Sequence, residues 1–266
     1  MKQYNTLAVI ISAFGLLLLN SCASYKNIPY FKNIPDSTHV YKNGVLVDVT
    51  PYEQIRVQPN DILSVDIQTI DPEVNNVMGH DAPVAGRAVT TENDAASVGY
   101  LVDADGNIEL PIAGKIKVGG LTTAEAKESV RRKALNYYKE PVVNLRIINF
   151  KVTVLGEVTK PGAYLINGEK ATILDALGQA GDMSIFGTRT NVLLTRREGN
   201  QQKMVRFDMT DTDIFSSPYF YLRQGDVLYV QPTKGKAAAN DGAALRTYTL
   251  ITSTLSLLVV VITRIN

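Results

Sequence analysis

Residues 151–164, KVTVLGEVTKPGAY, decide the fold of the second half of this chain. Hydrophobic residues alternate with other residues through Val152 and Val154, which is typical of a strand with one buried face. Pro161 and Gly162 then form a turn signal, because proline presets φ and glycine tolerates positive φ. The stretch therefore predicts two strands around a Pro-Gly turn.

A short helix and further strands follow this pair. Thr172 is a suitable N-cap for a helix that reaches Ala180, and Gly181 is suited to the left-handed residue that ends it. Strand patterning then continues to Val230. The order of strand, turn, strand, helix and further strands predicts a small β-grasp-like domain over residues 151–232.

A second region with strands lies upstream, over residues 50–150. Hydrophobic residues from Ile55 to Ile67 predict strands, and residues 100–111 predict a hairpin around an Asp-Gly turn. Thr122 and Glu125 fit a capping box that opens a helix ending before Pro141. Residues 71–98 are polar, small and aperiodic, which predicts a long loop. The fold class expected is α+β.

Similar turns introduce a strand in both regions. The first is Asn60-Asp61-Ile62-Leu63 and the second is Gly225-Asp226-Val227-Leu228. Aspartate at such a position commonly accepts hydrogen bonds from nearby backbone amides. We interpret Asp61 and Asp226 as structural residues rather than ligands.

The amino terminus has the features of a lipoprotein export signal. Lys2 precedes an apolar stretch from Leu7 to Leu19, whose roughly 20 Å of helix is too short to cross a bilayer core of about 30 Å. Leu19-Asn20-Ser21-Cys22 is similar to a bacterial lipobox, which implies cleavage before Cys22 and acylation of its thiol. The alternative is an ordinary signal peptide with an incidental cysteine. Ala23, rather than aspartate, follows Cys22 and favours the outer membrane, and the proline-containing segment 22–49 is expected to be a tether.

The carboxyl terminus holds a second uncharged run, 17 residues between Arg246 and Arg264. As a helix it spans about 25 Å, the height of the apolar band of outer-membrane barrels. At 100° per residue the hydroxyl side chains gather on one face, expected to line a pore: Thr249, Thr252, Ser253, Ser256 and Thr263. The other face is expected to meet lipid: Leu250, Ile251, Leu255, Leu257, Leu258, Val261 and Ile262. The run thus predicts a transmembrane amphipathic helix, with a single anchor helix as the alternative, since Ser and Thr hydroxyls can bond back to the helix backbone.

Composition argues against several classes of function. Lys and Arg number 27 and Asp and Glu 26, so no strong field points to nucleic acid. His39 and His80 are the only histidines, and with Cys22 assigned to lipid no Cys/His set for a metal is present. No nucleophile motif or carboxylate pair with suitable spacing occurs. We expect no enzyme activity, no metal and no cofactor other than the lipid on Cys22.

These segments together resemble the polysaccharide export family, the Wza-like outer-membrane lipoproteins. Residues Ile55–Ile67 and Gly99–Gly114 are similar to its export domain. Val154–Val158, Pro161–Tyr164 and Ala180–Asp182 are similar to its SLBB (soluble-ligand-binding β-grasp) domain. The resemblance implies a periplasmic ring, an octamer in the family, whose C-terminal helices form a barrel across the outer membrane. It also implies an inner-membrane co-polymerase of the tyrosine-kinase type as partner.

The expected function is that of an outer-membrane channel subunit that exports capsular polysaccharide or exopolysaccharide. The expected organisation is a signal peptide (1–21), a tether (22–49), an export domain (50–150), an SLBB domain (151–232), and a linker with a transmembrane helix (233–266). The alternative is a periplasmic glycan-binding or adaptor lipoprotein with a simple C-terminal anchor. The loop over residues 71–98 is expected to face the inner-membrane partner.

Overall fold

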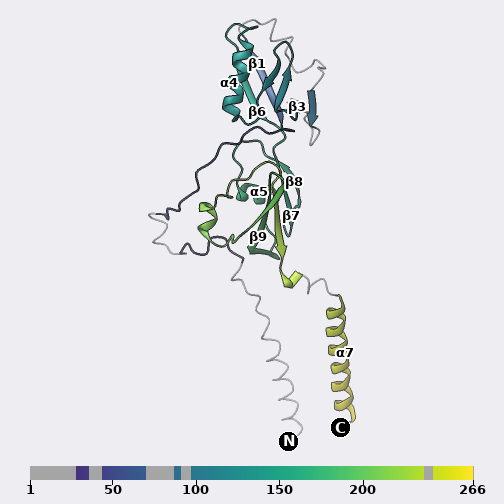
Figure 1. Cartoon of the computed structure of the whole chain (residues 1–266). Helices are drawn as coiled ribbons and strands as arrows, with labels where there is room; N and C mark the ends of the chain where they lie inside the picture. The colour runs from purple at the N-terminus through teal and green to yellow at the C-terminus, as the bar shows by residue number, and fades with distance from the viewer. Residues whose placement is uncertain (1–27, 36–43, 70–86, 91–96, 237–241, 266) are drawn as a thin grey trace.

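A computed structural model describes residues 28–35, 44–69, 87–90, 97–236 and 242–265. Figure 1 shows two domains stacked end to end, with helix α7 set apart below the second domain. The coarse prediction of a mixed α and β protein is confirmed.

The first domain is built on a four-stranded antiparallel sheet in the order β2-β3-β1-β6 and a separate hairpin, β4-β5. Its strands are β1 (Ile62–Gln68), β2 (Arg87–Thr90), β3 (Ser97–Leu101), β4 (Asn107–Leu110), β5 (Gly114–Lys117) and β6 (Val142–Ile147). Helix α4 (Thr123–Ala134) buries Ala126, Val130 and Ala134 in this domain's core. The predicted capping box is present, since Thr122 accepts from the amide of Glu125 and the Glu125 carboxylate accepts from the amide of Thr122.

Two predictions for the first domain are wrong. The turn at Asp103–Gly106 forms, but β3 pairs with β1 and β2 while β4 pairs with β5, so residues 100–111 are not a hairpin. A turn sequence fixes the local bend and not the strand partners, which tertiary packing selects. In addition, the predicted loop 71–98 contains β2 and the start of β3. The rest of that loop lies outside the described residues.

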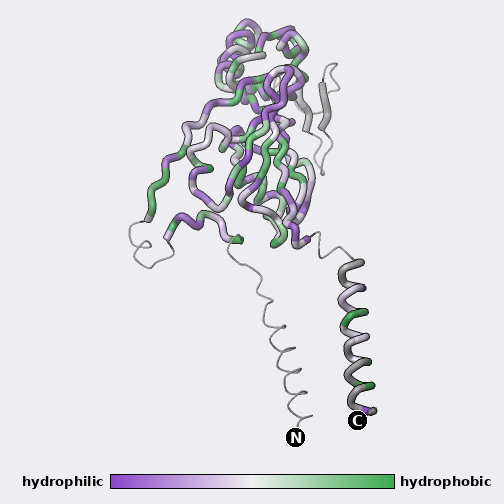
Figure 2. The backbone as a smooth tube through the Cα atoms, turned by 60° about the horizontal axis from the view of Figure 1, so that its bottom comes forward, coloured by the Kyte–Doolittle hydropathy of each residue, from purple (hydrophilic) through white to green (hydrophobic). Residues whose placement is uncertain are grey.

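The second domain has a five-stranded sheet in the order β10-β9-β11-β7-β8. Its strands are β7 (Lys151–Gly156), β8 (Gly162–Leu165), β9 (Gly187–Glu198), β10 (Gln201–Phe207) and β11 (Val227–Pro232). Strands β7 and β8 form the predicted antiparallel pair, and β11 runs parallel to β7. Figure 2 shows hydrophobic segments concentrated among these strands. Helix α5 (Ile173–Gln179) and the 3-10 helix η2 (Thr212–Ser216) complete the domain.

Thr172, Gly181 and Gly156, which flank α5 and end β7, have the structural roles that suit their residue types. Thr172 caps α5 through the amide of Asp175, and Gly181 ends the turn with φ of 74°. Gly156 has φ of 89° at the end of β7, where an added Cβ would lie 2.1 Å from the carbonyl oxygen of Val230. Only glycine fits this close approach of β7 to β11.

Part of the predicted tether packs on the second domain. The amide of Lys32 donates to the carbonyl of Thr210 at 2.7 Å, and the Phe31 ring lies 5.1 Å from the Phe215 ring. The Tyr30 hydroxyl donates to the carboxylate of Asp182. Tyr30 and Phe31 are partly buried and pack against the hydrophobic core of the second domain, so this part of the segment expected to be a tether is in contact with that domain.

Candidate functional site

A cleft of about 270 Å³ lies where the two domains meet. One wall is segment 50–56, whose strand pairing is limited to an isolated bridge between Arg56 and Thr122. It enters the junction with the Thr50 amide bonded to the carbonyl of Phe215 in the second domain. It leaves with the Val57 amide bonded to the carbonyl of Leu121 in the first domain. The other wall is the turn over residues 218–224. Both walls are thus attached to folded structure.

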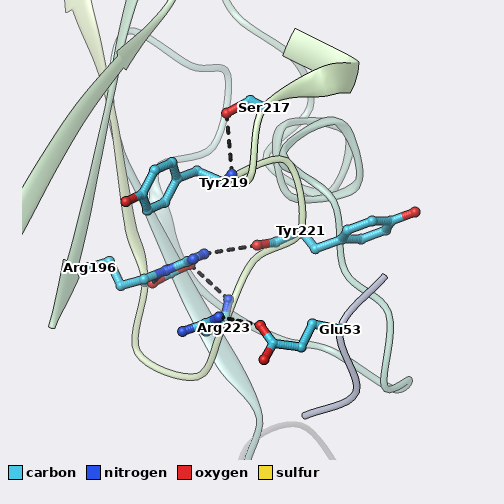
Figure 3. A network of polar contacts seen from close by, with 7 residues as sticks. Glu53, Arg196, Ser217, Tyr219, Tyr221 and Arg223 are labelled. Atoms are coloured by element: carbon cyan, nitrogen blue, oxygen red, sulfur yellow. Dashed lines mark hydrogen bonds and ion pairs between the residues drawn. The ribbon is translucent and has the colours of Figure 1, made fainter. Parts of the chain in front are cut away.

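A buried ion pair holds this turn, and Figure 3 shows its arginine, Arg196, beside Tyr221 and Arg223. The guanidinium of Arg196 on β9 donates to both carboxylate oxygens of Asp226, at 2.7 Å from Nη2 and 3.0 Å from Nε. The two side chains are only 4% and 1% exposed. Nη2 also donates to the carbonyl of Tyr221 at 2.8 Å, and Asp226 accepts from the amide of Arg223 at 2.8 Å. The pair therefore fixes the backbone between Tyr221 and Asp226.

The sequence interpretation of Asp226 as a turn residue is confirmed, but it missed Arg196. A signal was available: Val192, Leu194 and Arg196 lie on the same face of β9, and the first two are fully buried. An arginine on a buried strand face requires a carboxylate partner. The matching turn in the first domain places Asp61 in the same way, with its carboxylate accepting from the Gln58 amide at 2.8 Å. Burial raises the pKa of Asp61.

Asn149 joins the two turns across the junction. Its side chain donates to the carbonyl of Asn60 at 2.9 Å and accepts from the amide of Ile62 at 2.8 Å. Its carbonyl accepts from the Gln224 side chain at 2.7 Å. Asn149 therefore connects both domains by hydrogen bonds.

Aromatic and charged side chains line the opening of the cleft. The rings of Tyr52 and Tyr221 meet edge to face, with centroids 5.1 Å apart, and Lys170 lies over the Tyr52 ring at 4.8 Å. The Arg223 guanidinium pairs with the Glu53 carboxylate at 2.9 Å across the cleft. Figure 3 shows Tyr221 and Tyr219 pointing to opposite sides of the turn. Tyr221 thus faces the cleft, while Tyr219 lies against Arg196.

The C-terminal run forms helix α7 (Gly242–Ile265). Several of its hydroxyls donate to carbonyls of the same helix, including Thr249 to Arg246 and Ser253 to Leu250, each at 2.9 Å. Thr252 donates to the carbonyl of Tyr248 at 2.9 Å. Thr254, which the sequence interpretation passed over, lies on the aliphatic face and bonds back to Leu250 at 2.9 Å.

The transmembrane part of this prediction is not supported. Across the portion of the chain that the structure describes, no helix is sufficiently long and apolar to cross a membrane. Thr249, Thr252, Ser253 and Ser256 are exposed, as are Leu250, Ile251, Leu257 and Val261. The side chains of Leu255, Leu258, Ile262 and Thr263 lie outside what the structure describes, as do Cys22, His39 and His80.

A polar contact holds the start of the linker to α7 against the second domain. The largely buried carboxylate of Glu157 accepts from Ser184 Oγ at 2.6 Å and from Lys236 Nζ. These hydrogen bonds, first that from Lys236, lower the pKa of Glu157 below its ordinary value near 4.5. Lys236 lies only six residues before α7 begins. The contact therefore fixes where the linker leaves the domain.

We expect this contact to be lost in acid. A carboxyl with a lowered folded pKa stabilises the fold above its unfolded pKa, near 4.5, and this stabilisation disappears as the pH falls through the folded pKa. Glu157→Gln should therefore melt at a lower temperature than the native chain at pH 7 and at the same temperature well below pH 4. Glu109→Gln, at an exposed position on β4, is the control and should change neither. A pH-independent difference for Glu157→Gln would contradict the assignment.

Among the residues with assigned positions, no group of three or more His, Cys, Asp or Glu side chains is arranged to hold a metal ion.

The chain matches two known domain families in succession. Residues 49–148 match the family described as polysaccharide biosynthesis/export protein, and residues 151–208 match the SLBB domain. A similar relative is the EPS I polysaccharide export outer membrane protein EpsA of Ralstonia solanacearum, 27% identical over 215 residues. The protein of the same name from Ralstonia nicotianae is 28% identical over 216 residues. Each alignment covers 78% of this chain, which spans about half of each relative, 55% and 54% respectively.

Proposed function

We propose that this chain, which belongs to the polysaccharide biosynthesis/export family, acts in the export of a polysaccharide at the outer membrane. The observation that carries the proposal is the succession of the export and SLBB domains. Two relatives that align across 78% of the chain are named as polysaccharide export outer membrane proteins. The proposal covers capsular polysaccharide and exopolysaccharide alike.

The export assembly in this proposal is a ring of identical subunits, an octamer by resemblance to the family. Rings need subunits that keep their shape, since a flexible subunit would not repeat at a constant angle. The junction supports this, because Asn149 hydrogen-bonds both to the carbonyl of Asn60 in the first domain and to the side chain of Gln224 in the second. Each subunit then acts as one elongated unit.

Helix α7 has two faces that suit the interior and the exterior of such a ring. In the proposal Thr249, Thr252, Ser253 and Ser256 face a shared aqueous interior, and the aliphatic face is turned outward. The hydroxyls of Thr249, Thr252 and Ser253 already donate to their own helix, so they offer acceptor lone pairs and no fixed charge. A sugar polymer passing such a surface meets hydrogen-bond partners that do not hold it electrostatically.

The remaining parts of the proposal come from the amino terminus and the family resemblance. A lipid on Cys22 anchors the protein to the outer membrane, with most of the chain in the periplasm. Such an anchor is stable when the lipid carries more than one acyl chain. An inner-membrane co-polymerase of the tyrosine-kinase type delivers the polymer. No covalent chemistry is required of this chain.

A second candidate function is that of a periplasmic glycan-binding or adaptor lipoprotein. The cleft at the domain junction favours it, since a recognition module needs a binding site and a passive conduit does not.

A complementation experiment tests the export role. Cells that lack the chain should synthesise polysaccharide but accumulate it internally, and the full chain should restore it to the surface. Unchanged surface polysaccharide in cells without the chain would contradict the proposal.

A further inference from the structure

We propose that the cleft between the two domains binds a neutral pyranose unit of the polysaccharide. The proposal rests on the proposed function for the nature of the ligand, and on the cleft's own side chains for the site. Its volume of about 270 Å³ lies just below the range of about 300–1,000 Å³ usual for small-molecule sites. A ligand of one or two sugar rings is the size that fits.

The aromatic part of the cleft suits the apolar face of a sugar ring. Tyr52 and Tyr221 both line the cleft, and their ring planes meet at 74° to form a corner. The Tyr52 hydroxyl donates to the carbonyl of Glu169 at 2.7 Å, which fixes the orientation of its ring. Tyrosine offers a large, rigid, apolar surface with a polar end, and C–H groups of a pyranose pack on such a surface.

The polar part of the cleft suits the hydroxyl groups of the same sugar. Guanidinium groups provide donors in a fixed planar array, and carboxylates and carboxamides provide acceptors nearby. The lining side chains of this kind are Glu53, Gln54, Arg56, Gln58, Arg223 and Gln224. Adjacent sugar hydroxyls are both donors and acceptors, so this mixture pairs with them.

The charges of the cleft favour a neutral ligand. Arg56 and Arg223 are the cationic lining residues, and Glu53 and Asp61 are the anionic ones. Lys170 at the opening is engaged with the Tyr52 ring. Arg223 is already paired with Glu53. Arg56 likewise has a carboxylate partner, since its guanidinium lies 3.8 Å from the Glu125 carboxylate. A carboxylate on the sugar could only displace these partners, whereas a sugar hydroxyl can accept from a remaining guanidinium N–H or donate to the Glu53 carboxylate.

The cleft is preformed. The Arg196–Asp226 pair holds the Tyr221 carbonyl and the Arg223 amide, and Gln224 is tied to Asn149. A site whose side chains are fixed beforehand loses less conformational entropy when it binds a ligand. These hydrogen bonds distinguish the cleft from a gap between two loosely connected domains.

Saturation-transfer NMR with the full chain in detergent tests the proposal, using methyl glucoside, methyl galactoside and methyl mannoside as probes. We expect transfer to at least one of them. Tyr52→Leu removes the ring but keeps apolar bulk, and it should weaken binding about fivefold. Tyr52→Phe keeps the ring but loses its hydrogen bond to Glu169, so it should weaken binding less than Tyr52→Leu. Tyr137→Leu, at an exposed tyrosine outside the cleft, should retain binding.

Two results would overturn the site. One is the absence of transfer to all three methyl pyranosides, and the other is equal binding by the native chain and a folded Tyr52→Leu variant, as checked by circular dichroism. Neither result depends on export, because the assay uses purified protein. If the purified protein binds none of the three sugars but the full chain still restores surface polysaccharide in cells, the binding site is wrong and the export role stands.

Discussion

A chain that ends at Pro232 should fold but place no polysaccharide on the cell surface. Pro232 is the last residue of β11, so both hydrophobic clusters and all strands remain complete. The linker and α7 are removed, together with Lys236 and its contact with Glu157. If the α7 helices form the passage through the ring, the shortened chain leaves the polymer without a route. Surface polysaccharide, quantified in complemented cells beside an immunoblot of the variant, measures the effect.

Helix α7 also offers a matched pair of substitutions within the full-length chain. Thr252 and Thr254 both donate to backbone carbonyls four residues earlier, at 2.9 Å, but they lie on opposite faces of the helix. Thr252→Leu places a bulky apolar side chain on the hydroxyl face and should reduce export strongly. Thr254→Leu extends the aliphatic face and should leave export unchanged. Normal export by the shortened chain, or equal effects of the two leucine substitutions, would contradict the assignment of the faces.

Replacing Asp226 by alanine should lower the free energy of unfolding of the second domain by about 3–5 kcal/mol. The substitution leaves the guanidinium of Arg196 buried with no carboxylate partner, and it removes the acceptor for the Arg223 amide. Urea unfolding followed by circular dichroism measures the change. The double substitution Arg196→Met with Asp226→Leu should be less damaging than Asp226→Ala, because it leaves no unpaired charge.

The control for this prediction is the exposed pair at the cleft opening. Glu53 and Arg223 have side chains that are 78% and 52% exposed, so Glu53→Gln should change the free energy of unfolding by about 1 kcal/mol or less. A loss below about 1 kcal/mol for Asp226→Ala would mean that the buried pair does not hold the turn.

Local signals in the sequence predicted the local structure well. The capping residues Thr122 and Thr172, the left-handed Gly181 and the turn residue Asp226 all act as their chemistry requires. Each depends on contacts within a few residues along the chain. Such contacts are visible in a single sequence.

The errors concern contacts between distant residues. Tyr30 binds Asp182, and Arg196 reaches Asp226, over 152 and 30 residues respectively. The cleft likewise depends on segment 50–56 meeting the turn at 218–224. The separate pairing of β3 and β4 is another contact of this kind. Propensity and periodicity do not specify which distant partner a residue meets, so the sequence alone did not reveal the cleft.

Imaging of the full chain extracted in mild detergent, with a mass measurement of the same particles, tests whether the subunits form a ring. We expect closed rings of identical subunits around a central opening, with a mass that is a whole multiple of the subunit mass. Particles that remain single subunits across the concentration range used for imaging would contradict it.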